Sequence, residues 1–317
     1  MSDDSVPAAA AAGSGSPARR RRRPSRPSPL RRQRTLIAYA FLAPSLLVFL
    51  VFTAYPNLEG FRVSLFEYNP FRESFIGFDN YVELFGDPRF WGALRNTVVY
   101  ASITMVVTLV LALGLALLLN SRIAFRGFTR SIVFVPFVLS MGVVSIAFTF
   151  LLDPDMGWLT HVLRGIGFPP VAVLRDPFWA MATVIAVGVW KSVGYFTVII
   201  LAGLQQVPRE LYEAAAVDGV GCWQRFWNVT LPLLSNTTML VTVLLLIGGL
   251  SVFDQIYVMT AGGPYNSTES LVGYIFNRGF GELRMGYASA IAVIFTVIVM
   301  TLSLIQIRFF NRRTVQF

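Results

Sequence analysis

Six long apolar segments alternate with polar stretches along the chain, at about residues 35–55, 97–119, 131–152, 179–204, 234–253 and 286–309. None of them contains an acidic residue, and Lys191 is the only basic residue well inside one. A run of about 20 apolar residues crosses a bilayer as a helix. The pattern therefore predicts an all-α integral membrane protein with six transmembrane helices, two of them kinked by Pro44 and Pro136.

Composition supports this fold class and excludes some site chemistry. Of the 317 residues, 55% are hydrophobic and 14% are charged, whereas a soluble domain carries about 25% charged residues. The single cysteine, Cys222, excludes a disulfide or a cysteine metal site within the chain. The only histidine, His161, falls in a predicted outer loop. We therefore expect no metal site and no cofactor in this chain.

The arginines predict how the chain is oriented. Nine of them lie between Arg19 and Arg34, directly before the first apolar segment, in a stretch rich in Pro and Ser. We expect residues 1–34 to be a disordered cytoplasmic tail beside the lipid bilayer, not a nucleic-acid site. With the N-terminus inside, seventeen arginines lie on the cytoplasmic side and eight on the outer side. The positive-inside rule then places both termini, and residues 205–233, in the cytoplasm.

Motifs for an energy-coupling reaction are missing. A phosphate-binding loop needs Gly-Lys-Ser/Thr, but the only lysine, Lys191, follows Trp190. The apolar segments also lack the carboxylates that many ion-coupled transporters carry. We expect a conduit that is not an enzyme and that draws energy from a separate protein. An ion-coupled secondary transporter and a membrane enzyme are the contrasting interpretations, and neither has residues that favour it.

Residues 205–233 are too long for a plain turn between two spans. Pro208 suits the first position of a helix that runs through Ala216, and Gly219 suits its C-terminal stop. A second short helix is predicted after Gly221, ending at Leu231-Pro232. One face of it carries Trp223, Phe226, Trp227 and Thr230. The segment is therefore a predicted helix–turn–helix. An amphipathic hairpin lying on the membrane surface is the alternative.

The stretch "EAAAVDGVGCWQRFWNVTLP" at 213–232 resembles the EAA motif in permease subunits of binding-protein-dependent ABC importers. Four further stretches resemble the carbohydrate-uptake branch, similar to maltose-type and glycerol-3-phosphate-type permeases. They are "GFDNYVELFGDPRFWGALRNT" at 77–97, "VWKSVGYFTVIILAGLQQVPRELYEAA" at 189–215, "FDQIYVMTAGGPYNST" at 253–268 and "GYASAIAVIFTVIV" at 286–299. The resemblance covers the chain from about residue 36 onward. It implies that residues 35–317 form an ABC importer transmembrane domain with an EAA coupling loop at 205–233.

The resemblance also implies partners and a docking surface. The expected partners are a second permease subunit in a heterodimer, two cytoplasmic ATP-binding subunits, an extracytoplasmic solute-binding protein and a sugar substrate. In such importers the EAA loop docks on the ATPase. Carried onto this chain, the coupling residues would be Glu213, Ala214, Ala215, Asp218, Gly219, Arg225, Leu231 and Pro232.

A substrate pathway is predicted around Lys191, in the middle of the fourth apolar segment. A charge at that depth costs at least about 2.5 kcal/mol, so we expect it to face the bundle interior or a cavity. By the resemblance, the pathway would be lined by Lys191, Ser192, Tyr195, Leu245, Gly248, Gly249 and Val252. A lysine used only for helix packing is the alternative. A mono- or oligosaccharide is the expected substrate, and glycerol-3-phosphate or a polyol phosphate is the second candidate.

Overall fold

The computed structural model describes residues 29–70, 72–121, 126–166 and 172–311. The chain divides into two compact units, one up to Pro56 and the other from Asn57 onward. Most of the predicted Arg-rich tail, residues 1–28, lies outside the described residues. The first helix begins at Pro29, so residues 29–34, predicted as part of the disordered tail, are helical. Proline favours the first helical position and arginine is a good helix former, which accounts for the earlier start.

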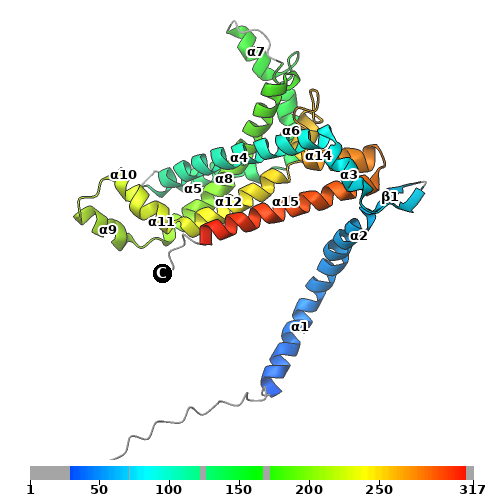
Figure 1. Cartoon of the computed structure of the whole chain (residues 1–317). Coiled ribbons are helices and arrows are strands. Elements are labelled where there is room, and N and C mark those ends of the chain that lie inside the picture. The colour runs from blue at the N-terminus through cyan, green and yellow to red at the C-terminus, as the bar shows by residue number, and fades with distance from the viewer. Residues whose placement is uncertain (1–28, 71, 122–125, 167–171, 312–317) are drawn as a thin grey trace, which may run out of the picture. The chain divides into compact units, whose positions relative to one another are not determined.

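The described residues are almost entirely helical (Figure 1). The helix α1 (Pro29–Phe49) continues through a π-helical turn, η1 (Leu50–Ala54), into α2 (Tyr55–Val63). The elements from β1 to α8 are β1 (Phe66–Asn69), β2 (Arg72–Phe75), α3 (Asp79–Gly86), α4 (Pro88–Asn120), α5 (Arg126–Val138), α6 (Met141–Leu151), α7 (Trp158–Gly165), η2 (Val173–Arg175) and α8 (Pro177–Gln206). The remaining elements are α9 (Arg209–Val217), α10 (Cys222–Arg225), η3 (Phe226–Thr230), α11 (Leu231–Leu233), α12 (Ser235–Leu250), α13 (Asp254–Met259), α14 (Leu271–Phe276), η4 (Asn277–Gly281) and α15 (Met285–Asn311).

Four helices in the described residues are long and apolar enough to cross a membrane: Ile37–Val63, α4, α8 and α15. Two further pairs pass the same test but are bent, α5 with α6 by 91° and Cys222–Leu233 with α12 by 71°. The number of spans is therefore 4, or up to 6 when each bent pair counts as one. The predicted fold class, a helical membrane protein, is confirmed.

Two of the long spans, α4 and α8, begin in the same way. Each starts with an Asp-Pro pair, in which proline occupies the first helical position and its missing N–H costs no hydrogen bond. The preceding aspartate accepts from the exposed backbone N–H groups: Asp87 from Arg89 at 2.9 Å, and Asp176 from Phe178 and Trp179 at 3.0 Å each. The sequence thus sets where both helices begin.

The third apolar segment differs from its prediction. It was expected to be one kinked helix over 131–152, but α5 and α6 meet at 91° with the break at Leu139–Ser140. Pro136 removes a backbone donor from the last turn of α5, and Ser140 starts α6 in an extended conformation. The bend leaves carbonyl groups at the end of α5 without helical partners.

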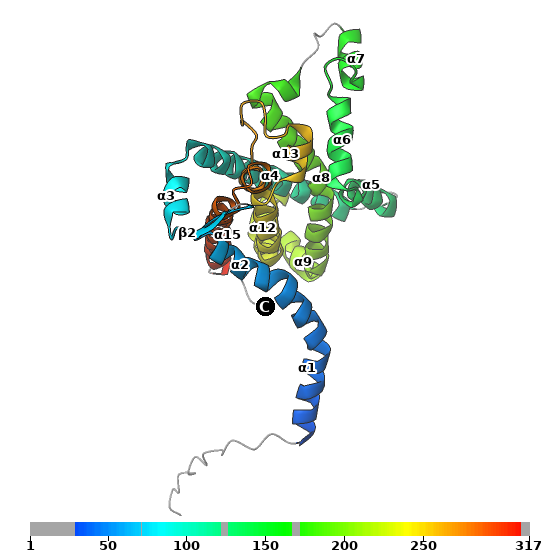
Figure 2. The ribbon, with the colours of Figure 1, turned by 90° about the vertical axis from the view of Figure 1, so that its right-hand side faces the viewer.

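Small residues let the helices of the second unit pack closely. The bundle is built from α4 against α8 and α12, α5 against α8, and α12 against α15. A Cβ added at Gly194 of α8 would lie 1.8 Å from the Val133 carbonyl oxygen of α5, and one at Gly249 of α12 would lie 2.9 Å from the Cα of Ala101 on α4. Figure 2 shows α6 and α7 projecting away from this bundle, on the side where α13 packs against α6.

A short antiparallel hairpin, which the sequence did not predict, interrupts the helical fold. Its strands β1 and β2 pair Phe66 with Phe75 and Asn69 with Arg72. The hairpin packs on the start of α15, where a Cβ on Gly286 would lie 1.9 Å from the Phe66 carbonyl oxygen. Only a glycine allows the strand backbone to approach the helix this closely.

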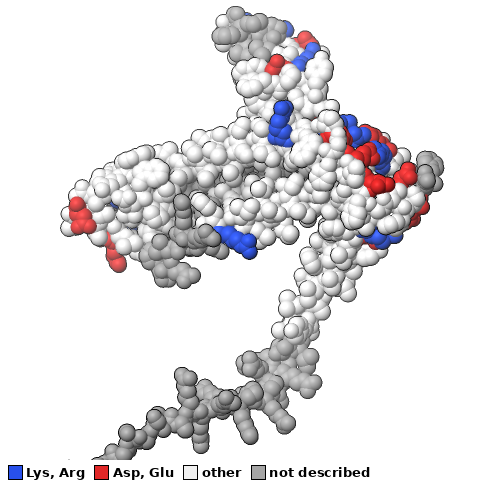
Figure 3. All heavy atoms as spheres, viewed as in Figure 1, with Lys and Arg blue, Asp and Glu red and all other residues white. Residues whose placement is uncertain are grey.

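The end of the bundle that carries α3 and α14 is held by charged side chains. Arg89 donates to both carboxylate oxygens of Glu269 at 2.8 Å, and Glu269 is only 2% exposed. Arg284 forms the same two-pronged pair with Glu83 at 2.7 and 2.6 Å. Figure 3 shows acidic side chains gathered at the ends of the bundle and near α7, with an almost uncharged face between. This pattern is typical of a protein whose middle lies in lipid.

Asp87 connects the starts of three elements at this end. Its carboxylate accepts hydrogen bonds from Tyr274 of α14 and from Tyr287 of α15, the latter at 2.9 Å, and Arg278 lies 3.3 Å away. Burial by itself would raise the pKa of Asp87, but these hydrogen bonds, the Arg89 backbone N–H and the Arg278 charge lower it overall. The ionised carboxylate therefore holds α4, α14 and α15 together.

Candidate functional site: a central cavity and a helical pair at one end

The segment 205–233 forms two short helical arms at the end of the bundle opposite α3 and α14 (Figure 1). The first arm is α9, and it stops at Gly219, whose φ of +70° is a left-handed conformation that favours glycine. The Val220 N–H donates to the Ala215 carbonyl at 3.0 Å, and the Gly219 N–H donates to the Ala216 carbonyl at 3.2 Å. These two bonds are the Schellman pattern of helix ends. The structure ends this arm at the glycine that the sequence indicated.

The second arm differs from the prediction in where it ends. The chain stays helical through α10, η3 and α11 to Leu233, beyond the predicted end at Leu231-Pro232, and it turns into α12 at Leu234. Pro232 cannot donate to the turn before it, and the π-helical turn η3 lies directly before α11. The proline therefore distorts the helix without ending it.

Exposure separates the predicted coupling residues into two groups. Glu213, Ala214, Asp218 and Gly219 are exposed on α9 and its turn, whereas Ala215 is only 8% exposed and lies inside the segment. Arg225 is half-buried, and its guanidinium lies 5.9 Å from the centre of the Tyr212 ring. This contact joins the second arm, which carries Arg225, to the first arm, which carries Tyr212. Leu231 is half-buried and Pro232 is exposed. Trp223, on the predicted aromatic face, is 75% exposed, while Thr230 is buried. The exposed surface is thus made by α9 and its turn, together with Trp223, Trp227 and Pro232 of the second arm.

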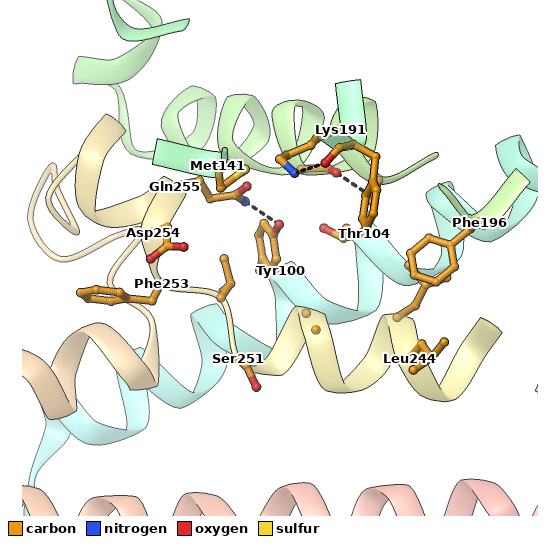
Figure 4. A pocket seen from close by; sticks show the side chains of 17 residues that line it. Tyr100, Thr104, Met141, Lys191, Phe196, Leu244, Ser251, Phe253, Asp254 and Gln255 are labelled. Atoms are coloured by element: carbon orange, nitrogen blue, oxygen red, sulfur yellow. Dashed lines mark hydrogen bonds between the residues drawn. The ribbon is translucent and has the colours of Figure 1, made fainter. Parts of the chain in front are cut away.

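A cavity of about 290 Å³ lies between α4, the α5–α6 bend, α8 and α12 (Figure 4). Six of the seven predicted pathway residues line it: Lys191, Ser192, Leu245, Gly248, Gly249 and Val252. The seventh, Tyr195, does not line the cavity. Its ring stacks on Phe137 at 4.2 Å between ring centres and 10° between planes, and Phe137 itself lines the cavity. Tyr195 thus supports the wall from behind.

Lys191 has a partner inside the protein. Its Nζ donates to the Phe137 carbonyl oxygen at 3.1 Å and lies 5.1 Å from the centre of the Phe137 ring. That carbonyl is at the end of α5, where the bend removes the helical donor. The ammonium group therefore completes the last turn of α5 and, as a cation, is favoured at a helix C-terminus. Its remaining N–H groups are available to the cavity.

The sequence missed several residues that line the cavity. Tyr100 and Thr104 come from α4, Met141 from the start of α6, and Asp254 and Gln255 from the start of α13. A signal for two of them was present, because Tyr100 and Thr104 are polar residues one helical turn apart in an otherwise apolar segment. Asp254 and Gln255 follow the fifth segment directly, and nothing in the sequence shows that α13 folds back over the cavity.

The described residues thus combine a helical membrane bundle, a central cavity and a pair of short helical arms at one end. Residues 104–316 match the family of the binding-protein-dependent transport system inner membrane component. The match covers more than half of the chain, so the chain belongs to this family. It is a multi-pass inner-membrane permease of an ABC importer and is not itself the catalytic component. The resemblance to such permeases is thereby confirmed.

Relatives and a solved structure agree with this assignment. The probable ABC transporter permease protein YurN of Bacillus subtilis is 40% identical over 285 residues, covering 88% of this chain and 97% of YurN. The lactose transport system permease protein LacF of Rhizobium radiobacter is 35% identical, covering 88% of this chain and 95% of LacF. A crystal structure of a bacterial ABC transporter for import of the acidic polysaccharide alginate matches with a TM-score of 0.79 and 27% identity, covering 88% of this chain and 96% of that chain.

Proposed function

We propose that this chain moves a mono- or oligosaccharide across the membrane as one of two permease subunits. Two ATPase subunits drive the movement, and an extracytoplasmic solute-binding protein delivers the sugar. The observation that carries the substrate class is the cavity, in which Lys191 and Ser192 lie beside Tyr100 and Phe137. Hydroxyl, amide and ammonium groups match sugar hydroxyls, and ring faces match sugar C–H faces. The similar proteins named for lactose and alginate support this choice.

The size of the cavity supports one sugar ring at a time. Small-molecule pockets usually measure about 300–1,000 Å³, and this one, at about 290 Å³, is just below that range. A longer sugar would extend beyond it. In the proposed heterodimer, the sister permease supplies the facing wall.

We further propose that residues 205–233 and both termini lie in the cytoplasm, and that the exposed part of the segment docks on the ATPase. Seventeen arginines on that side against eight on the other favour this orientation. Glu213 is exposed on α9 and offers a carboxylate to a basic partner. Ala214 is exposed beside it, and its small side chain allows a close approach. The buried Ala215 holds the segment together instead.

Glycerol-3-phosphate or a polyol phosphate is the second candidate substrate, because the only lysine of the chain lines the cavity. A phosphate would pair with its ammonium group. Two observations favour a neutral sugar. Lys191 already donates to the Phe137 carbonyl, and Asp254 places a carboxylate at the same cavity. A phosphate would have to approach that negative charge.

Reconstituted transport tests the proposal. The chain is assembled with its sister permease, ATPase and binding protein in proteoliposomes, and uptake of labelled lactose, maltose and glycerol-3-phosphate is measured with and without ATP. We expect ATP-dependent uptake of a sugar. Uptake of glycerol-3-phosphate alone would select the second candidate, and sugar uptake that persists when the ATPase is omitted would overturn the proposed coupling.

A further inference from the structure

The cavity has a polar wall on the side that faces Lys191. Tyr100 and Thr104 point from α4 toward α8, and Gln255 reaches the same space from α13 (Figure 4). All three side chains are buried, with exposed fractions of 4%, 6% and 2%. Burying polar groups in a membrane protein is costly unless each finds a hydrogen-bond partner. The hydrogen bonds within the protein therefore show which of these polar groups already have a partner and which could still bind a ligand.

Tyr100 and Gln255 are hydrogen-bonded to each other. The Gln255 amide donates to the Tyr100 hydroxyl oxygen at 2.5 Å and to the Val184 carbonyl of α8 at 3.2 Å. Gly188 makes room for this pair, because a Cβ there would lie 2.3 Å from the Tyr100 hydroxyl oxygen. The hydroxyl oxygen of Tyr100 thus accepts from Gln255, and its own proton remains for the Thr104 hydroxyl one turn further along α4. Three elements fix this wall in place.

Thr104 is the residue of this wall whose hydroxyl still has hydrogen-bonding capacity for a ligand. Its Oγ1 is buried and interacts with the Tyr100 hydroxyl one turn earlier, but its own proton has no acceptor of normal geometry among the described residues. Most buried hydroxyls in helices bond to a carbonyl one turn earlier, as Thr97, Thr197 and Thr242 do here at 2.6–2.8 Å. Thr104 differs from them and lies on the cavity wall.

We infer that Thr104, supported by the Tyr100–Gln255 pair, binds a hydroxyl group of the transported sugar and so helps to determine specificity. The inference rests on the proposed function, since it names a contact in the same cavity. A hydroxyl ligand can both donate to Thr104 Oγ1 and accept from it, which supplies the missing partner. A site built for a hydroxyl rejects an analogue that lacks it, because the buried protein group is then left unpaired.

The chain offers a matched control on the same helix. Thr108 lies one turn beyond Thr104, is fully buried, and has no hydrogen-bond partner for its Oγ1 among the described residues. Thr108 does not line the cavity. Replacing either threonine by valine removes one hydroxyl and keeps the side-chain shape. A purely structural role for such hydroxyls predicts equal effects at both positions, whereas sugar binding predicts an effect at Thr104 alone.

The experiment measures initial uptake of labelled lactose and maltose in proteoliposomes of the complete complex. For Thr104→Val we expect a rise in KM of about 3–10-fold, the value of one neutral hydrogen bond, with little change in the maximal rate. Thr108→Val should keep the wild-type KM, and Thr104→Ser should restore it. ATPase activity without sugar, measured for every variant, shows that each complex assembles.

The outcomes separate the inference from the proposed function. If the wild type imports a sugar and Thr104→Val keeps its KM, the inference is wrong while the proposed function stands. Equal losses in Thr104→Val and Thr108→Val also contradict the inference, because both hydroxyls would then act through the fold. If the wild-type complex imports glycerol-3-phosphate and no sugar, the proposed function fails and the inference fails with it.

Discussion

The close packing of α5 on α8 can be tested by Gly194→Ala. The added Cβ would lie 1.8 Å from the Val133 carbonyl oxygen and 2.7 Å from its carbon. Ordinary contact begins at 3.4 Å, so α5 would have to move by about 1.6 Å. The obstacle is backbone and cannot rotate aside. Overpacking of this kind costs about 1–3 kcal/mol. For a chain of 317 residues we expect the Tm of the purified protein to fall by about 2–5 °C.

Gly114→Ala provides the control for this prediction. Gly114 lies inside α4, is exposed, and has no heavy atom within 4 Å of an added Cβ. Since alanine is the better helix former by about 1 kcal/mol, Gly114→Ala should keep or raise the Tm. The fraction of protein that stays monodisperse in detergent after heating measures the Tm of both variants. Equal Tm values for the two variants would refute the close contact between α5 and α8.

Two further predictions concern the two ends of the bundle. The pKa of Asp87 is lowered in the fold, so its ionised form stabilises the protein above its unfolded pKa of about 3.9, and this is lost as pH falls through the folded-state pKa. The Tm of the wild type should therefore fall more steeply between pH 5 and pH 3 than that of Asp87→Asn, and parallel curves would count against the role of Asp87. At the other end, Gly219→Pro should abolish co-purification of the ATPase, because proline cannot adopt the φ of +70° and lacks the N–H that bonds to Ala216. Gly219→Asn, which tolerates a positive φ, should keep the ATPase bound, and an ATPase that stays with both variants would contradict docking through this turn.

The fold was predictable where one physical signal dominates. Long apolar runs identify membrane helices because a bilayer demands them, and the Gly219 stop follows from the left-handed turn that ends α9. The 91° bend between α5 and α6 was not predictable as such. Pro136 indicates a weak point but gives no angle, because the angle depends on contacts with neighbours such as the bond from Lys191 to Phe137.

The cavity was predictable from α8 and α12 but not from α4. Lys191 stands out as a charge in an apolar helix, and the resemblance to sugar permeases supplied the other predicted positions on α8 and α12. Helical spacing alone pointed to Tyr195, which does not line the cavity. By contrast, Asn96, Tyr100, Thr104 and Thr108 recur every fourth position of α4 and mark one face, but the sequence does not show which other elements meet that face. Tyr100 and Thr104 become interpretable only when α13 brings Gln255 against them. A contact between residues 155 positions apart in the chain leaves no local signal in either segment.

The arrangement of α8 gives a physical route between the proposed docking surface and the cavity. Lys191 lies in the middle of this helix, which ends at Gln206, only three residues before α9 begins at Arg209. Fifteen residues of helix span about 22 Å and behave as one stiff element. Tight contacts at Gly194 and Gly203 leave α8 no room to move independently of α5 and α12. If a partner displaces α9 as proposed, we expect α8 to carry α5 and α12 with it, and the bond from Lys191 to the end of α5 to move the bent wall of the cavity. The proposed docking segment is therefore joined directly to the helix that carries the cavity lysine.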